Sequence, residues 1–89
     1  MARVAVNIKV ADYEAWRESF DGDKDARVAA GVREEKVYVN SDDDTDVTVV
    51  CETDDPTKMI EAVRTPEWRE KMASRGVQGE PKFFIAQAA

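Results

Sequence analysis

The chain has 89 residues, of which 19 are acidic and 13 are basic, and it contains no histidine. Its formal net charge of −6 argues against a surface that binds nucleic acid by neutralising phosphates. The absence of histidine excludes histidine catalysis and classical zinc sites. We expect one small domain, residues 1–89, with a single core.

Cys51 is the only cysteine, so no internal disulfide can form, and a reducing compartment is the natural setting. No apolar leader follows Arg3, and no segment approaches the ~20 apolar residues needed to span a bilayer. We therefore expect a soluble cytoplasmic protein without membrane contact. The acidic runs at 21–25, 42–46 and 54–55 are typical of solvated turns, and adaptation to salt is an alternative explanation.

The first half of the chain predicts a strand followed by a helix. Residues 3–10 (RVAVNIKV) carry an apolar side chain at every second position, which is the period of a strand. Asp12 is a good helix N-cap, and Trp16 and Phe20 follow at helical spacing. We expect a kink or break at Gly22 and the end of the helix at Gly31.

The second half predicts a hairpin, a broken helix and a last strand. Strands are expected at 32–40 and 47–53, joined by an acidic turn at 41–46. Asp55-Pro56 begins a helix, and Thr65-Pro66 repeats the same signal, so this second helix is expected to break there. Gly76 ends it, residues 79–81 are expected to be a loop, and 82–86 (KFFIA) form the fourth strand.

The order β-α-β-β-α-β predicts an α+β, ferredoxin-like fold: a four-stranded antiparallel sheet with both helices on one face. The first and third strands are then central neighbours. Pairing Asn7 near Val50 gives a wholly apolar helix-facing side, which is made of Val4, Val6, Ile8, Val10, Val47, Val49 and Cys51. The helices are expected to cover it with Trp16, Phe20, Ile60, Val63 and Trp68.

The opposite face of this sheet should be polar if it is left in water, but it contains an apolar patch. The apolar patch consists of Ala5, Val50, Tyr38, Phe84 and Ala86. The polar residues around it are Asn7, Lys9, Lys36, Thr48 and Glu52. Patches of this kind mark interfaces, and small domains gain stability from a partner. We therefore expect a homodimer in which two sheets pack through Ala5, Val50, Tyr38 and Phe84.

Motifs along nearly the whole chain resemble one family. They lie at 10–17 (VADYEAWR), 20–21 (FD), 30–32 (AGV), 54–56 (DDP), 65–72 (TPEWREKM), 76–77 (GV) and 79–81 (GEP). These segments resemble small dimeric α/β-barrel proteins similar to the antibiotic-biosynthesis monooxygenases, some of which are labelled cyclases. The resemblance implies two sheets that close into one barrel and a cavity between each sheet and its helices. Family members often carry a histidine in the middle of the first helix, where this chain has Asp23 or Lys24.

The residues able to form such a pocket are few. Trp16 and Trp68 could line an apolar cavity for a small apolar or aromatic substrate, with Tyr13, Arg17, Asn7 and Tyr38 as the polar groups that orient a phenol and accept its proton. The alternative is that both tryptophans are core residues and that Arg17 is a surface ion-pairing residue. A buried Asn7 needs hydrogen-bond partners, either across a dimer or on a ligand.

No metal or cofactor is expected. Aspartates at 42, 44, 46 and at 21, 23, 25 have calcium-loop spacing, but each run lacks the glycine and glutamate that such a loop requires. Cys51 lies among valines and is expected to be an inert core thiol.

Two functions remain open: a cofactor-independent monooxygenase or cyclase, or a non-catalytic homodimeric ligand-binding or structural module. An RNA-recognition domain has the same topology, but it needs stacking aromatics where the central strands have Asn7 and Val50. Regulatory amino-acid-binding domains also share the topology, but they normally accompany an enzyme.

Overall fold

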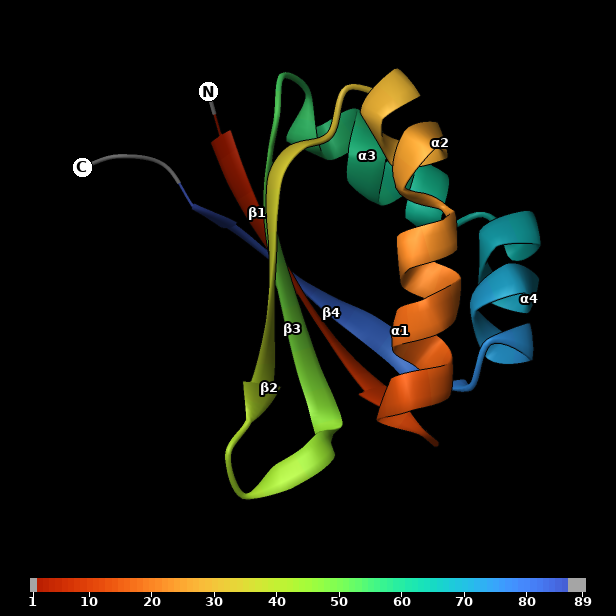
Figure 1. Ribbon diagram of the computed structural model, residues 1–89. Helices are drawn as coiled ribbons and strands as arrows, with labels where there is room; N and C mark the ends of the chain where they lie inside the picture. The colour runs from red at the N-terminus through yellow and green to blue at the C-terminus, as the bar shows by residue number, and fades with distance from the viewer. Residues whose placement is uncertain (1, 87–89) are drawn as a thin grey trace.

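The computed structural model describes residues 2–86. Its elements are β1 (Ala2–Val10), α1 (Tyr13–Gly22), α2 (Lys24–Ala29), β2 (Arg33–Asn40), β3 (Asp43–Thr53), α3 (Pro56–Val63), α4 (Pro66–Ser74) and β4 (Val77–Ala86). The strands form one sheet in the order β2-β3-β1-β4, and each neighbouring pair is antiparallel. The helices all lie on one side of this sheet (Figure 1). The ferredoxin-like prediction, with β1 and β3 in the centre, is therefore confirmed.

The predicted helix boundaries follow from local capping. The Asp12 side chain accepts a hydrogen bond from the Glu14 amide at 3.1 Å, which satisfies one of the free N–H groups at the start of α1. Asp55 does the same for α3, with Pro56 at the first helical position. The expected interruption at Gly22 separates α1 from α2, and the expected break near Thr65 separates α3 from α4.

The register of the central strands differs from the prediction by two residues. Asn7 pairs with Thr48, and Ala5 pairs with Val50. Because side chains alternate along a strand, a shift of two residues leaves every side chain on its predicted face. The apolar side therefore does face the helices, and Val4, Val10, Val47 and Cys51 on it are almost completely buried.

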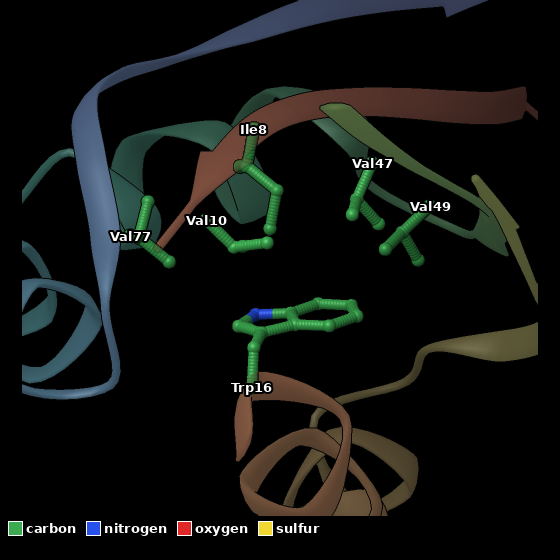
Figure 2. Close-up of a cluster of buried hydrophobic side chains, with 6 residues drawn as sticks. All are labelled: Ile8, Val10, Trp16, Val47, Val49 and Val77. Atoms are coloured by element: carbon green, nitrogen blue, oxygen red, sulfur yellow. The ribbon is translucent and has the colours of Figure 1, made fainter. Parts of the chain in front are cut away.

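The main core is a cluster of six buried residues, namely Ile8, Val10, Trp16, Val47, Val49 and Val77. Figure 2 shows the indole of Trp16 reaching from α1 toward the strand residues. Phe20 and Met72 pack against the same cluster. Trp68, which was expected in this layer, is instead partly exposed, and its ring lies 4.7 Å from Lys71 Nζ. Of the two tryptophans, Trp16 alone belongs to this buried cluster, so the expectation that Trp68 also covers the sheet is wrong.

Two strand boundaries were predicted too late in the chain. β3 begins at Asp43, so most of the expected acidic turn is strand, and Asp46 pairs with Lys9 of β1. β4 begins at Val77, so the expected loop at 79–81 is also strand. In both places, pairing with a neighbouring strand overrides a local composition that is typical of turns. None of the helices within residues 2–86 is long and apolar enough to cross a membrane.

Candidate functional site

A groove of about 470 Å³ opens between the helices α1 and α2 and the edge strand β2. Its apolar walls are Phe20, Val28, Val32 and Val37. Its polar walls are Arg17, Asp21, Lys24, Arg27, Arg33, Glu34 and Glu35. A hollow between a sheet and its helices that combines apolar walls with charged groups is a candidate small-molecule site, and in this groove the charged residues outnumber the apolar ones.

An irregularity in β2 shapes this groove. Arg33 pairs with Glu52 and Lys36 pairs with Val50, so Glu34 and Glu35 together occupy the place opposite Cys51. Glu34 has a φ of 50°, in the left-handed region that side-chain-bearing residues rarely adopt. Glu35 lies two residues before Val37 on the helix-facing side, where its side chain is only 13% exposed, and the bulge changes the pairing of the preceding residues Arg33 and Glu34.

Arg27 of α2 holds the Glu35 carboxylate. Its Nε donates to Glu35 Oε2 at 2.5 Å, and its Nη1 donates to the Phe20 carbonyl oxygen at 2.8 Å. The guanidinium also lies 3.6 Å from the centre of the Phe20 ring, within the range of a cation–π contact. Three different contacts therefore fix Arg27 in the wall of the groove, while its side chain stays 17% exposed.

Arg17 lies farther along the same groove, one helical turn before Asp21. Its Nε donates to both carboxylate oxygens of Asp21, at 3.0 and 3.2 Å, and its Nη1 lies 3.5 Å from the Tyr13 hydroxyl. Partial burial acts to lower the pKa of Arg17, but the hydrogen bonds with Tyr13 and Asp21 raise it overall, so the side chain remains a cation. Tyr13 and Arg17, two of the predicted pocket residues, are thus neighbours.

Trp16 lies between these polar residues but faces away from the groove. It is 5% exposed and belongs to the core, with its ring stacked on Phe20 at 4.9 Å and tilted against Tyr13 at 6.1 Å. By stacking on Phe20, Trp16 holds this apolar wall of the groove in place from the core side. Trp68 lies on α4 and does not contribute to the lining of the groove within residues 2–86.

Asn7 and Tyr38 lie on the opposite face of the sheet, so the six predicted pocket residues do not form one site. Asn7 Nδ2 donates to Asp46 Oδ1 at 2.8 Å, to the Val47 carbonyl at 3.3 Å and to Thr48 Oγ1 at 3.1 Å. Its amide therefore finds partners within its own chain, which corrects the expectation that they come from a dimer or a ligand. The hydrogen bonds from Asn7 and Asn40 hold the pKa of Asp46 below its ordinary value.

This second face carries the predicted apolar patch. Antiparallel pairing aligns Lys36, Val50, Ala5 and Phe84 in one row across the sheet, and Tyr38, Thr48, Asn7 and Lys82 in the next. In the single chain, Phe84 is 67% exposed and Tyr38 is 54% exposed. We refer to Ala5, Tyr38, Val50 and Phe84 as the open-face patch.

A smaller hollow of about 310 Å³ lies between α3, α4 and β4. Val63, Pro81 and Phe83 form its apolar part, and Arg64 lies 5.5 Å from the centre of the Phe83 ring. Arg69 pairs with Glu80 at 3.0 Å across its rim. Both side chains of that pair are more than half exposed, so the pair holds the rim of this hollow less rigidly than the mostly buried Arg27–Glu35 pair holds the wall of the groove.

The acidic runs are used for ion pairs. Asp23 pairs with Arg75 and Lys71 of α4, Asp21 pairs with Arg17, and Asp43 pairs with Lys9. In the part of the chain that the structure describes, no three cysteine or carboxylate side chains gather as a metal site would require. Cys51 is buried, and burial raises the pKa of its thiol.

Sequence reasoning missed Arg27 and Glu35 as a pair, although a signal was present. Arg27 continues the inward register of Trp16 and Phe20, and Glu35 stands two residues before the inward-facing Val37. Opposite charges at two inward positions predict a buried ion pair, because an unpaired charge there would be costly. The bulge at Glu34, however, leaves no comparable sign in the sequence.

No protein-family model matches the chain, and no curated protein sequence matches it significantly. Solved structures do match. A Bordetella bronchiseptica protein assigned to the antibiotic biosynthesis monooxygenases is 12% identical, with a TM-score of 0.76 over 99% of this chain and 96% of that one. SnoaB of Streptomyces nogalater, a cofactor-independent oxygenase, is 15% identical, with a TM-score of 0.60 over 99% and 94% of the two chains.

The third structure is the Streptomyces coelicolor monooxygenase ActVA-Orf6, in complex with nanaomycin D. It is 15% identical, with a TM-score of 0.64 over 99% of this chain and 87% of that one. At such identities the similarity establishes the fold: the chain has the ferredoxin-like fold of the antibiotic biosynthesis monooxygenases. The fold of the single chain that the resemblance implies is therefore confirmed.

Proposed function

We propose that the chain is a small enzyme that resembles cofactor-independent monooxygenases or polyketide cyclases and acts on a small apolar or aromatic substrate in the groove. The observation that carries this proposal is the groove itself, where apolar walls meet two arginines held by fixed contacts. Proteins with the same fold support it, since SnoaB is a cofactor-independent oxygenase and ActVA-Orf6 was solved with nanaomycin D.

In such an oxygenation, the substrate supplies the electrons. A base removes a proton from an activated CH₂ group, and the resulting carbanion reduces O₂. The CH₂ group becomes a carbonyl, one oxygen atom enters the product, and the other leaves as water. Asp21, Glu34 and Glu35 are the groove carboxylates that could accept the proton, and the positive charge of Arg17 would stabilise the substrate anion. No step requires a metal or an organic cofactor.

A non-catalytic homodimeric ligand-binding or structural module is the alternative. One specific observation favours it: Trp16 fills the layer between α1 and the sheet instead of lining an enclosed aromatic cavity. In that case the groove would bind a ligand without converting it.

The proposal includes a homodimer formed through the open-face patch. Phe84 and Tyr38 together expose a large apolar area on one flat sheet face, and a second copy of the chain would remove it from water. A reducing, cytoplasmic setting is also part of the proposal, because the lone Cys51 is a free thiol.

Oxygen uptake with anthrone, a tricyclic aromatic ketone with an acidic CH₂ group, tests the enzymatic proposal. We expect protein-dependent O₂ consumption and the formation of anthraquinone, detected by mass spectrometry. Val28→Trp should abolish this activity, because Val28 is 57% exposed and lines the groove, so added bulk fills the groove without disturbing the core. Ala29→Trp is the matched control, since Ala29 is exposed on the same helix but is not among the lining residues.

Equal rates with and without the protein for anthrone and related activated aromatics would contradict an oxygenase. Retained activity in Val28→Trp would place the chemistry outside the groove.

A further inference from the structure

The groove gathers four cationic side chains although the protein as a whole has a net charge of −6. Four cationic side chains, Arg17, Lys24, Arg27 and Arg33, line it together with three carboxylates, Asp21, Glu34 and Glu35. Arg17, Arg27 and Arg33 each pair with a carboxylate, so within residues 2–86 the charge of Lys24 is the one that these ion pairs leave uncompensated. An uncompensated cation beside apolar walls indicates a ligand that carries a negative charge.

Three of these cations already have carboxylate partners. Arg27 is held by Glu35 and the Phe20 carbonyl, and Arg33 pairs with Asp54 at 2.8 Å. Arg17 directs its Nε to Asp21, and its terminal Nη1 makes only the long 3.5 Å contact with Tyr13. Lys24 lines the groove together with Asp21, Glu34 and Glu35, but within residues 2–86 it forms no ion pair.

We propose that the groove binds a small carboxylate-bearing ligand, with its anionic group at the end formed by Arg17 and Lys24 and its apolar body against Phe20, Val28 and Val37. This inference rests on the groove being the binding site of the proposed function. Lys24 is the one lining cation without an ion-pair partner within residues 2–86, so the site suits a monoanion, whereas a dianion would be repelled by Asp21, Glu34 and Glu35. The terminal nitrogens of an arginine also match the planar geometry of a carboxylate.

Binding of 2-naphthoate and 2-naphthamide, followed by NMR titration, tests this inference. The two probes have the same aromatic body and differ in charge. We expect 2-naphthoate to bind about fivefold more tightly than the amide at low ionic strength, as exposed ion pairs allow. Added salt should remove this advantage by screening the charges. The shifted amide signals should be those of groove residues such as Phe20 and Val28.

Lys24→Gln should weaken binding of 2-naphthoate about threefold and leave binding of 2-naphthamide unchanged. Lys58→Gln is the matched control, because it makes the same change in net charge on α3, outside the groove. It should leave the affinities of both probes unchanged.

Equal affinities for the two probes, or equal effects of Lys24→Gln and Lys58→Gln, would overturn the carboxylate inference and leave the groove as a binding site. Signals shifted only at Val50 and Phe84 on the open face, or no binding of either probe, would also overturn it. The oxygen-uptake assay decides the proposed enzymatic function separately.

Discussion

Replacing Trp16 by alanine should lower the free energy of unfolding by about 4 kcal/mol, as large-to-small substitutions of buried aromatic residues do. Trp16 is 5% exposed and packs against Ile8, Val10, Val47, Val49 and Val77, so its removal leaves a cavity that these strand side chains cannot fill. The lost stacking on Phe20 adds to the effect. A domain of this length has a total stability of roughly 4 to 13 kcal/mol, so the loss would be a large part of it.

Urea unfolding, followed by far-ultraviolet circular dichroism, measures this loss. All variants should be compared at one protein concentration, because the stability of an associating protein depends on concentration. Trp68→Ala is the control. Trp68 is partly exposed on α4, so its replacement should lower the free energy of unfolding by only about 1 kcal/mol, a typical value for a point mutation. Trp16→Phe, which retains a ring, should fall between the two.

Equal losses for Trp16→Ala and Trp68→Ala would refute the reasoning. That result would mean that the indole of Trp16 does not fill the layer between α1 and the sheet. The layer would then have room for a ligand beside Trp16, as the sequence alone first suggested.

Three further predictions concern the open face and the core. The protein should be a dimer by light scattering, and Val50→Asp or Tyr38→Asp should dissociate or unfold it; an unchanged mass for both would exclude this face. The pKa of Asp46 is lowered in the folded state by Asn7, so its contribution to stability is present above the unfolded pKa and is lost as the pH falls through the folded pKa. The unfolding free energy of Asn7→Ala should therefore differ less from that of the wild type at pH 3 than at pH 7, and a constant difference would contradict this. Because burial raises the pKa of Cys51, its thiol should react with a disulfide reagent only slowly in the native protein and much faster in denaturing urea; equal rates would show that the thiol is accessible.

The fold could be predicted because its signals are local and agree with one another. Period-two apolar residues give the strands, Asp12 and Asp55 begin helices, and the glycines end them. The faces of the sheet follow from alternation alone, which is why a register error of two residues left the predicted sides intact. The strand boundaries at Asp43 and Val77 could not be predicted, because they depend on pairing with strands distant in sequence.

The candidate site was harder to predict because it depends on three-dimensional detail. Apolar residues at helical spacing, such as Trp16, fit a core and a pocket equally well. Asn7 was correctly singled out as unusual for a strand, but its partners come from Asp46 and Thr48, about forty residues away, in a segment expected to be a turn. Glu35 faces inward by alternation with Val37, but the bulge at Glu34 beside it holds a left-handed residue, and no periodicity predicts such a residue in a strand.

Strand β2 links the two candidate surfaces. Val37 lines the groove on the helix side, while the next residue, Tyr38, belongs to the open-face patch. A second copy packed on the open face would therefore leave the groove accessible from the helix side, because the sheet separates the two surfaces. Each chain would carry a complete groove, since every lining residue comes from α1, α2, β2 or the residues that connect α2 to β2. Ligand binding should then occur once per chain, and β2 is the element that the two surfaces share, with Glu35 and Val37 on the groove side and Tyr38 on the open face.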